Sequence, residues 1–596
     1  MITKDMSRDS LFDELGLKRL KESYMAPGEV SPQERFAYVS NFFASNPAHA
    51  QRLYEYSSKH WLSYSTPILS FGRNKRGLPI SCFLSYIEDT AEGLVDTLSE
   101  TNWLSMLGGG VGLHLGIRNA DDKSVGVMPH LKVYDSASLA FKQGTTRRGS
   151  YAAYLDISHP DIIQFLEMRK PTGDQNMRTL NLNHGINITD KFMELVERAM
   201  LDPNVDDSWD LIQPNTGKVV ETVSAKELWA RILEMRIQTG EPFVVFIDTA
   251  NNALPKFQKD KGMKIHGSNL CTEIFLATDA LRTAVCCLSS INLVYWDEIR
   301  PVLKQFIRDV MEMLDNVLTY FIDNAPDTVA RARYSAMRER SIGIGALGFH
   351  SYLQKKHVAF EGVMAKVINR NIFKEIREAE DLVNIELAQE RGPCPDAADA
   401  GLMLRFAHTG AIAPNASSSL IMGNVSPSAE VTAANVYRQD TSSGAFIHRN
   451  KFLDVILKEE AKKHNDAWYE ETWASITAND GSVQHLDWMD ENTKAVYKTA
   501  MEVDQRWVVE LAADRQEFID QGQSVNLFFR PDVNIKYLHA VHFQAWKQGL
   551  KSLYYCRSTK LRKADKVGQK VVRHKIEEEI DLQALAEGNS CIACEG

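Results

Sequence analysis

The chain of 596 residues lacks any apolar run long enough to cross a bilayer. A membrane-spanning helix needs about 20 apolar residues, whereas stretches such as FVVFI at 243–247 are far shorter. The N-terminal stretch MITKDMSRDSLFDELG is polar and lacks the apolar segment of a secretory signal. We therefore expect a cytoplasmic protein that does not bind membranes.

Cysteine is scarce as well, and eight cysteines in so long a chain exclude a disulfide framework. In a reducing compartment these side chains should remain thiols unless catalysis oxidises them. An excess of basic charge is also lacking, since 68 Lys and Arg stand against 78 Asp and Glu for a net charge of -10. Wholesale binding of nucleic acid is therefore not expected, although a local phosphate site is not excluded.

The order of segments predicts a large α/β domain behind a helical start. Residues 1–62 look helical, with Ser31 as N-cap, Pro32 in the first turn and Glu34 completing a capping box. The tract 63–448 alternates short apolar runs with longer amphipathic segments. Such alternation predicts crossover units around a buried parallel sheet or barrel.

Two further segments follow. The stretch 449–558 returns to helical, charged sequence and should also hold the last barrel segments, whereas 559–596 is a charged tail ending in Cys591 and Cys594. A zinc site would need two more ligands, and the tail offers only His574. A dithiol that forms and reopens a disulfide fits the pair better.

The stretch GIGALG at 343–348 matches the glycine pattern of dinucleotide-binding proteins. It lacks the apolar strand that should precede such a motif and the acidic residue that should follow about 20 positions later. We interpret it as a tight turn beside the core.

The stretch SNLCTEI at 268–274 places an amide, a thiol and a carboxylate at alternate positions. If it is extended, Asn269, Cys271 and Glu273 project from one face. The pattern alone leaves open a buried strand with incidental polar residues and a site where the cysteine does chemistry.

Other candidates gain meaning only in combination. Cys82 and Cys286 lie in apolar, strand-like runs, where a lone cysteine is usually a small hydrophobe. Together with Cys271 and the terminal dithiol they suggest a chain of thiol exchange. Tyr554 and Tyr555 are either core aromatics or stepping stones for a radical.

Taken together, these stretches resemble the catalytic large subunit of class I ribonucleotide reductase, from about residue 60 onward. The motifs that carry the resemblance stand in consistent order: STPILSFGRNKRGLPISC, NLCTEI, AVCCLSSINL, PNASSS, QSVNLFF, HFQAWKQGLKSLYYCRS and the terminal cysteine pair. The resemblance implies a ten-stranded α/β barrel of two antiparallel five-stranded halves. SNLCTEI would lie on a central finger loop, and a helical N-terminal region would precede the barrel.

The resemblance also implies a division of labour at the site. Cys271 would become a transient thiyl radical that takes the 3′ hydrogen of the ribose. Glu273 would be the base on the 3′ hydroxyl, and Asn269 would hydrogen-bond the sugar hydroxyls. Cys82 and Cys286 would supply two reducing equivalents and end as a disulfide.

Partners are implied in the same way. Cys591 and Cys594 would reduce that disulfide and be recharged by thioredoxin or glutaredoxin. Tyr554 and Tyr555 would relay the radical from a small subunit with a dimetal centre, so this subunit itself would bind no cofactor and no metal. The remaining cysteines are interpreted as structural: Cys287, Cys394 and Cys556.

Nucleotide sites follow from the resemblance too. Substrate phosphate would be held by small hydroxyls and backbone N–H groups, namely those of Thr66, Ser81, Asn415, Ala416, Ser417, Ser418 and Ser419. Without the resemblance, the Ser-rich stretch 415–419 would be interpreted as an ordinary polar loop. A deoxynucleoside triphosphate or ATP would act as specificity effector, with Asp89 on its ribose and Arg118 near its phosphates. Arg147 or Arg148, in the linking loop Gln143–Ser150, would reach the substrate base.

The expected activity is reduction of ribonucleotides, with diphosphates as the expected substrates, to 2′-deoxyribonucleotides for DNA synthesis, by a homodimer. The STP motif begins by residue 65, so we expect no N-terminal ATP-cone and no inhibition by dATP through one. Two rival functions are less consistent with these residues. A cobalamin-dependent reductase of the same barrel has no use for paired tyrosines. A silent regulatory subunit would have no use for five redox cysteines. The C-terminus also lacks the glycine loop of a glycyl-radical form.

Overall fold

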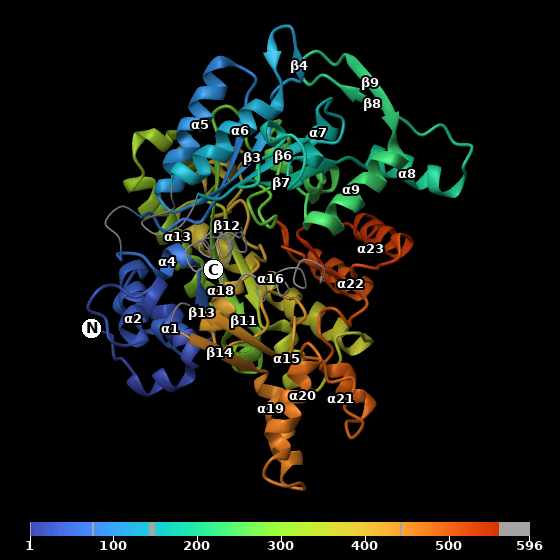
Figure 1. The fold of residues 1–596 in the computed structure, drawn as a ribbon. Coiled ribbons are helices and arrows are strands. Elements are labelled where there is room, and N and C mark those ends of the chain that lie inside the picture. Colours follow the sequence, from blue (N-terminus) through green and yellow to red (C-terminus); the bar gives the residue numbers. More distant parts are fainter. Residues whose placement is uncertain (1, 74–76, 142–148, 442–443, 559–596) are drawn as a thin grey trace.

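Helices open the chain in the computed structural model, which describes residues 2–73, 77–141, 149–441 and 444–558. They form the blue group in Figure 1 and lie beside the barrel. After a 3₁₀ turn at Met6–Leu11, they are α1 (Glu14–Ser23), α2 (Pro32–Phe43) and α3 (Pro47–Ser58). The predicted helical N-terminal region is thus confirmed.

The start of α2 follows from its capping residues. The Ser31 hydroxyl accepts a hydrogen bond from the Gln33 backbone at 3.1 Å, and the Glu34 carboxylate accepts one from the Ser31 backbone at 3.3 Å. Pro32 occupies the first turn, where its missing N–H costs no hydrogen bond. The helix therefore begins where the local sequence predicts.

Five parallel strands form the first half of the barrel. Each pairs with the next in parallel. They are β2 (Cys82–Ile87), β3 (Gly110–Leu115), β6 (Tyr151–Asp156), β7 (Asn183–Ile188) and β10 (Phe243–Phe246). Their near-continuous apolar sequences arise because both faces are covered. The covering helices are α5 (Ala91–Met106), α6 (Val127–Ala140), α7 (Ile162–Glu167), α8 (Asp190–Leu201) and α9 (Ala225–Thr239).

The second half contains three regular strands and two irregular segments. The strands are β11 (Ala284–Asn292), β12 (Ile342–Leu347) and β16 (Ser552–Leu553), and the segments are 410–412 and 523–525. β12 pairs in parallel with β11 and meets the first segment through a bridge between Ile344 and Gly410. That segment meets the second through a bridge between Ile412 and Gln523.

Hydrogen bonds close these pieces into a ring. The backbone N–H of Tyr554 donates to the Val525 carbonyl at 2.8 Å, which joins the second segment to the β16 strand. β16 is antiparallel to β10, and β11 is antiparallel to β2, so the two halves run in opposite directions. Within the described residues the predicted barrel of two five-stranded halves is confirmed, although two of its members are too irregular to count as strands.

The remaining strands lie outside this ring. β1 (Leu62–Tyr64) pairs with β11 in antiparallel fashion. Four separate pairs complete the described strands: β4 (Ala120–Asp121) with β5 (Ser124–Val125), β8 (Ser208–Ile212) with β9 (Val219–Ser224), β13 (Val436–Thr441) with β14 (Gly444–Arg449), and β15 (Leu527–Phe529) with β17 (Cys556–Ser558).

The GIGALG stretch is a buried strand, so its interpretation as a tight turn was wrong. A Cβ atom on Gly343 would lie 2.4 Å from the Leu288 side chain, and one on Gly345 would lie 2.6 Å from the Ala411 carbonyl. The glycines therefore allow neighbouring barrel members to approach the strand closely. Only Gly348, with a φ of +78°, makes a turn, at the end of β12.

Helices of six to 29 residues surround the second half and the C-terminal part. They are α13 (Leu303–Asn324), α14 (Ala330–Glu339), α15 (Phe349–Lys355), α16 (Val363–Arg391), α19 (Lys451–Ala461), α20 (Trp468–Ala478), α21 (Glu491–Val496), α22 (Gln505–Gln516) and α23 (Ile535–Lys547). In Figure 1, α19 and α20 project from the lower end of the molecule. No helix among the described residues combines the length and the apolar character that a bilayer crossing requires.

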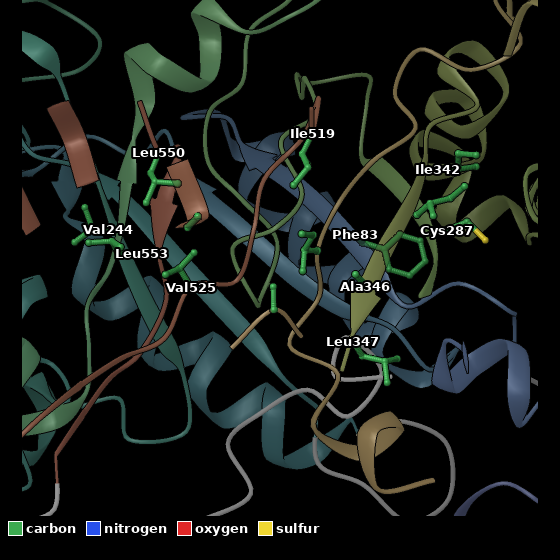
Figure 2. Packing of buried hydrophobic residues seen from close by; sticks show 14 of the residues in the cluster. Phe83, Val244, Cys287, Ile342, Ala346, Leu347, Ile519, Val525, Leu550 and Leu553 are labelled. Carbon is green, nitrogen blue, oxygen red and sulfur yellow. The ribbon is translucent and has the colours of Figure 1, made fainter. Parts of the chain in front are cut away.

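The core lies between the barrel wall and these helices. Figure 2 shows Phe83, Cys287 and Ile342 packed on the outer side of the second half, and Val244 beside Leu553 where the halves meet. A smaller buried cluster fills the barrel itself and includes Cys82, Cys271, Cys286, Tyr154, Phe243 and Tyr554. Three of the predicted redox thiols, Cys82, Cys271 and Cys286, thus lie together in a water-poor interior.

Candidate active site

The SNLCTEI stretch is a loop inside the barrel. It has no regular strand or helix and lies between α11 (Lys256–Lys259) and β11. From the first half, the Tyr154 hydroxyl donates to the Asn269 carbonyl at 2.5 Å, and a Cβ on Gly112 would lie only 1.9 Å from the loop backbone. From the second half, Ser552 donates to the Thr272 carbonyl at 2.8 Å. The expected central finger loop is thus present.

The conformation of this loop departs from an extended strand. The Asn269 side-chain oxygen accepts hydrogen bonds from the backbones of Glu273 and Ile274, both at 3.1 Å, so the chain bends back on itself. Thr272 has a φ of 67°. The extended conformation on which side-chain alternation depends is therefore not adopted. Asn269, Cys271 and Glu273 are nevertheless all buried in the same loop.

Cys271 lies at the end of an aromatic path. The Tyr554 hydroxyl donates to its sulfur at 3.5 Å. The rings of Tyr554 and Tyr555 have centroids 4.4 Å apart, and Phe243 packs against both at 4.7 and 5.0 Å. Tyr555, Tyr554 and the Cys271 thiol thus form one continuous series of contacts inside the barrel.

Glu273 is held by a serine that sequence reasoning missed. The Ser524 hydroxyl lies 3.2 Å from a Glu273 carboxylate oxygen and 2.5 Å from the Cys271 carbonyl. The Gly522 backbone donates to the Glu273 carbonyl at 2.8 Å. Ser524 belongs to the QSVNLFF motif, so a signal was present, but nothing local linked that motif to the loop.

Cys82 and Cys286 face each other across antiparallel strands. They are direct register partners in the β2–β11 pair, and both are thiols. Opposed residues of such a pair have Cα atoms about 4.5–5.5 Å apart, which lies within the range that a disulfide spans. Burial is the main reason that the pKa of Cys286 lies well above its ordinary value, and the neighbouring Cys82 is the next. The Cys286 thiol therefore stays protonated at neutral pH.

Two amides approach the sulfur atoms of this pair. Asn269 donates to Cys82 at 3.5 Å, and Gln521 donates to Cys286 at 3.6 Å. Cys287, one position further along β11, belongs instead to the cluster outside the barrel. Alternation along the strand thus turns Cys286 toward Cys82 and Cys287 away from the loop.

The predicted phosphate loop forms the short helix α18 (Ala416–Ile421) behind Asn415, which has a φ of 56°. The Asn415 amide donates to the carbonyls of Ala346 and Ala413, both at 3.1 Å, and its oxygen accepts from Ser290 at 3.1 Å. These bonds hold the left-handed conformation that begins the helix.

Helix α1 connects this loop to Thr66, the first residue of α4 (Thr66–Leu69). Tyr24, which directly follows α1, hydrogen-bonds the Thr66 hydroxyl at 3.2 Å, and Arg19 of α1 donates to the Ser417 hydroxyl at 3.4 Å. Ser81 stands elsewhere, beside the thiol pair, where its hydroxyl accepts from Cys82 at 3.4 Å. Arg19 is a cation at the predicted phosphate site that sequence reasoning missed, because no motif contains it.

The predicted effector residues form an ion pair. Arg118 donates to the Asp89 carboxylate at 2.5 Å, and Asn215 also reaches this carboxylate, at 3.4 Å. Asp89 follows the end of β2, so both residues lie beyond the carboxyl edge of the first half. Four other predicted site residues lie outside the described residues: Arg147, Arg148, Cys591 and Cys594.

Family comparisons agree with this architecture. The model of the ribonucleotide reductase all-alpha domain matches residues 10–77, and that of the ribonucleotide reductase barrel domain matches residues 80–403 and 399–556. The barrel and its buried central thiol therefore place the chain among the ribonucleotide reductases.

Individual relatives narrow the assignment. The ribonucleoside-diphosphate reductase large subunit of Invertebrate iridescent virus 3 is 50% identical over the full length of both chains. That of Danio rerio is 32% identical over 92% of this chain and 76% of its own. The structure of the Actinobacillus ureae class Id ribonucleotide reductase alpha subunit matches with a TM-score of 0.81 and 33% identity, over 93% of this chain and 98% of that one. The chain belongs to the large, catalytic subunits of class I ribonucleotide reductase and is an enzyme that reduces ribonucleotides.

Proposed function

We propose that this chain reduces ribonucleoside diphosphates, the substrates in the names of its relatives, by thiyl-radical chemistry on Cys271. The proposal rests on one observation: two separate contacts occur in the same buried cluster inside the barrel. Tyr554 lies 3.5 Å from Cys271, and Cys82 stands in register with Cys286. A radical path and a two-electron reductant thus meet at the same loop.

The first step removes a hydrogen that no side-chain base could take. The Cys271 thiyl accepts the 3′ hydrogen of the ribose and becomes a thiol, which leaves a carbon radical on the sugar. Glu273 accepts the proton of the 3′ hydroxyl, and Ser524 fixes the direction of its carboxylate. Asn269 is the hydrogen-bonding partner for the sugar hydroxyls in this proposal.

The second step consumes the thiol pair. One thiol hydrogen of the Cys82–Cys286 pair protonates the 2′ hydroxyl, which leaves as water, and the other goes to the 2′ carbon, so the two sulfurs end as a disulfide. Glu273 returns its proton to the 3′ oxygen, and Cys271 returns the hydrogen to the 3′ carbon. Because Cys286 is held protonated by burial, it can serve as a hydrogen donor at neutral pH.

The radical itself comes from outside this chain in our proposal. A small subunit with a dimetal centre generates it and passes it through Tyr555 and Tyr554 to Cys271. The adjacent tyrosine rings and the contact of Tyr554 with the thiol support this order. After turnover, Cys591 and Cys594 reduce the new disulfide and are recharged by thioredoxin or glutaredoxin, in the reducing cytoplasm.

Substrate phosphate is bound at the loop that begins at Asn415. Thr66 and Ser417 offer hydroxyls, and Arg19 supplies the positive charge that a diphosphate requires. Ser81 lies beside Cys82, so it belongs to the part of the site nearest the thiols. The Ser417, Ser418 and Ser419 side chains are buried, which limits competition from water.

Binding of the effector and formation of a dimer are proposed at the carboxyl edge of the first half of the barrel, where Asp89 and Arg118 lie. A deoxynucleoside triphosphate or ATP binds Asp89 through its ribose and Arg118 through its phosphates. It replaces the contact that these two residues make with each other, and it sets substrate preference. The helices α5 and α6 beside this pair carry exposed apolar side chains, namely Val95, Trp103, Val133 and Leu139. Pairing of these helices between two copies would bury that surface and make a homodimer with the effector sites at its interface.

Reconstitution tests the proposal. The purified chain is mixed with its small subunit, a dithiol, a ribonucleoside diphosphate and an effector, and deoxyribonucleotide is measured. We expect turnover that is abolished by Cys271→Ser and by omission of the small subunit. Product from Cys271→Ser would overturn the proposal, and turnover with adenosylcobalamin in place of the small subunit would favour the cobalamin-dependent rival.

A further inference from the structure

Tyr555 has a hydrogen-bond donor that the reaction described above does not use. The side-chain N–H of Asn183, the first residue of β7, donates to the Tyr555 hydroxyl oxygen at 2.9 Å. Asn183 is buried, and Tyr555 is partly buried against the cluster inside the barrel. Loss of hydration raises the pKa of Tyr555 well above its ordinary value, with the charge of Glu241 as the next cause.

Glu241 fixes the orientation of the Asn183 amide. One of its carboxylate oxygens accepts from the same Asn183 nitrogen at 2.7 Å, so the two N–H groups of the amide point to Glu241 and to Tyr555. A flipped amide would turn its own oxygen toward the carboxylate, and two acceptors would repel. The amide therefore has one stable orientation.

The Glu241 carboxylate is held in turn as an anion. Its other oxygen accepts from the His184 backbone and ring, both at 2.9 Å, and Arg169 lies 3.6 Å away. Burial would raise the pKa of Glu241, but the Arg169 charge and the His184 hydrogen bonds outweigh burial and lower it. The carboxylate is thus charged at neutral pH and remains a permanent acceptor for Asn183.

This arrangement determines where the Tyr555 proton lies. A phenol oxygen has two favourable positions in the plane of its ring, one for an accepted hydrogen bond and one for its own proton. Asn183 occupies the first, so the hydroxyl hydrogen takes the second. Since the phenolate is strongly disfavoured here, Tyr555 must exchange an electron and a proton together rather than ionise first.

We propose that Asn183 is a positioning residue for the radical relay, held by Glu241, and that it sets the direction in which Tyr555 hands over its hydrogen. The inference rests on the proposed relay. The radical that the small subunit supplies first takes the hydroxyl hydrogen of Tyr555. The resulting Tyr555 oxygen radical takes the hydroxyl hydrogen of Tyr554, which becomes the new radical, and Tyr554 then takes the thiol hydrogen of Cys271. Each step moves one hydrogen atom, so no proton is released and the small-subunit radical is the oxidant for the whole sequence.

Asn183→Ala in the reconstituted holoenzyme is the first test. A misdirected hydrogen should lower kcat about 10- to 100-fold while KM for the diphosphate changes little, because a positioning error of this kind affects the reaction and not binding. Asn369→Ala is the matched control, since Asn369 is also buried and donates to a backbone carbonyl, that of Leu511, at 2.8 Å between outer helices. The control should lower thermal stability without a comparable fall in kcat.

A spectroscopic readout separates positioning from general loss of packing. With 3-aminotyrosine at position 555, the trapped radical should show coupling to an exchangeable proton donated to its oxygen. That coupling should disappear in Asn183→Ala. Glu241→Gln provides a second variant should Asn183→Ala fail to fold, with an altered coupling and a smaller loss of kcat expected, because a neutral amide no longer enforces one orientation.

Each outcome distinguishes the two proposals. Full turnover and an unchanged radical spectrum in Asn183→Ala, with Tyr555→Phe inactive, would overturn this inference and leave the relay intact. Full turnover in Tyr555→Phe would overturn the relay itself. Loss of kcat in Asn183→Ala together with the missing coupling would support both.

Discussion

The hydroxyl of Tyr554 lies 3.5 Å from the sulfur of Cys271, although 283 residues separate them in the chain. Both side chains are buried inside the barrel, so no bulk water separates the phenol from the thiol. A hydrogen atom can therefore pass directly between oxygen and sulfur. This contact makes the reactivity of the finger loop dependent on the last strands of the barrel.

Removal of that hydroxyl should stop turnover without disturbing the fold. Tyr554→Phe keeps the ring that packs on Phe243 and loses only the oxygen, so we expect deoxyribonucleotide formation to fall to background while nucleotide binding by calorimetry is unchanged. Tyr352→Phe is the control, because it deletes another hydroxyl with a hydrogen bond, to Asp297 at 2.9 Å, outside the barrel. Persistent turnover in Tyr554→Phe would show that the radical takes another path.

In a chain that carries Cys591→Ser and Cys594→Ser, so that the tail cannot reduce the product, a single turnover should leave one disulfide between Cys82 and Cys286. Their register on neighbouring strands places their Cα atoms within the range that a disulfide spans. Peptide mapping after rapid quenching should find this pair linked and Cys287 still reduced, because Cys287 belongs to the outer cluster. A link that involves Cys287 instead would contradict the assignment of the reducing pair.

Loss of the Ser524 hydroxyl should impair catalysis more than binding. Ser524→Ala leaves the Glu273 carboxylate without the donor at 3.2 Å, so kcat should fall by about 10-fold or more, as expected for a misaligned base, with KM nearly constant. Ser552→Ala is a matched control, since its hydroxyl anchors the same loop at the Thr272 carbonyl but does not touch Glu273. Equal losses in both variants would mean that Ser524 only anchors the loop.

The positive charge of Arg19 should matter for the diphosphate. Arg19→Met removes the cation that contacts Ser417, so we expect KM for the ribonucleoside diphosphate to rise about tenfold, the effect of losing one charge-assisted contact of roughly 1.4 kcal/mol. Lys21→Met, on the exposed side of the same helix, is the control for overall charge. An unchanged KM in Arg19→Met would place the phosphates elsewhere.

A buried carboxyl on α16 should make stability depend on pH. Burial, only partly offset by Arg377, raises the pKa of Glu380 to about 8, so between pH 4.5 and 8 the folded chain keeps a proton that the unfolded chain has lost. The free energy of unfolding should therefore fall as pH rises through this window, by up to about 1.4 kcal/mol per pH unit.

Glu380→Gln tests this dependence because the amide cannot ionise. Thermal unfolding followed between pH 5 and 8 should show a shallower decline for the variant than for the native chain, with the largest gain in Tm near pH 8. Glu378→Gln, an exposed residue on the same helix, should leave the curve unchanged. Parallel curves for Glu380→Gln and the native chain would contradict a protonated Glu380.

Local physical chemistry already determined much of this protein in the sequence. The capping box at Ser31, the apolar runs of β2 and β11 and the amphipathic helices between strands are properties of neighbouring residues, so they could be predicted without long-range information. The order of motifs identified the family and with it the thiols and tyrosines. Side-chain period alone could not separate a strand from the finger loop, because Asn269 bends the backbone through its own hydrogen bonds.

Tertiary structure decided how distant segments meet. Three contacts join residues that are far apart in the chain: Cys82 pairs with Cys286, Ser524 hydrogen-bonds Glu273, and Asn183 hydrogen-bonds Tyr555. The barrel closes through the segments 410–412 and 523–525. As a result, neighbouring barrel members approach the GIGALG strand closely at its glycines. Such contacts depend on which segments pack together when the ring closes. The sequence by itself therefore determined the elements and the reactive residues, and only the closed barrel brought those residues into one site.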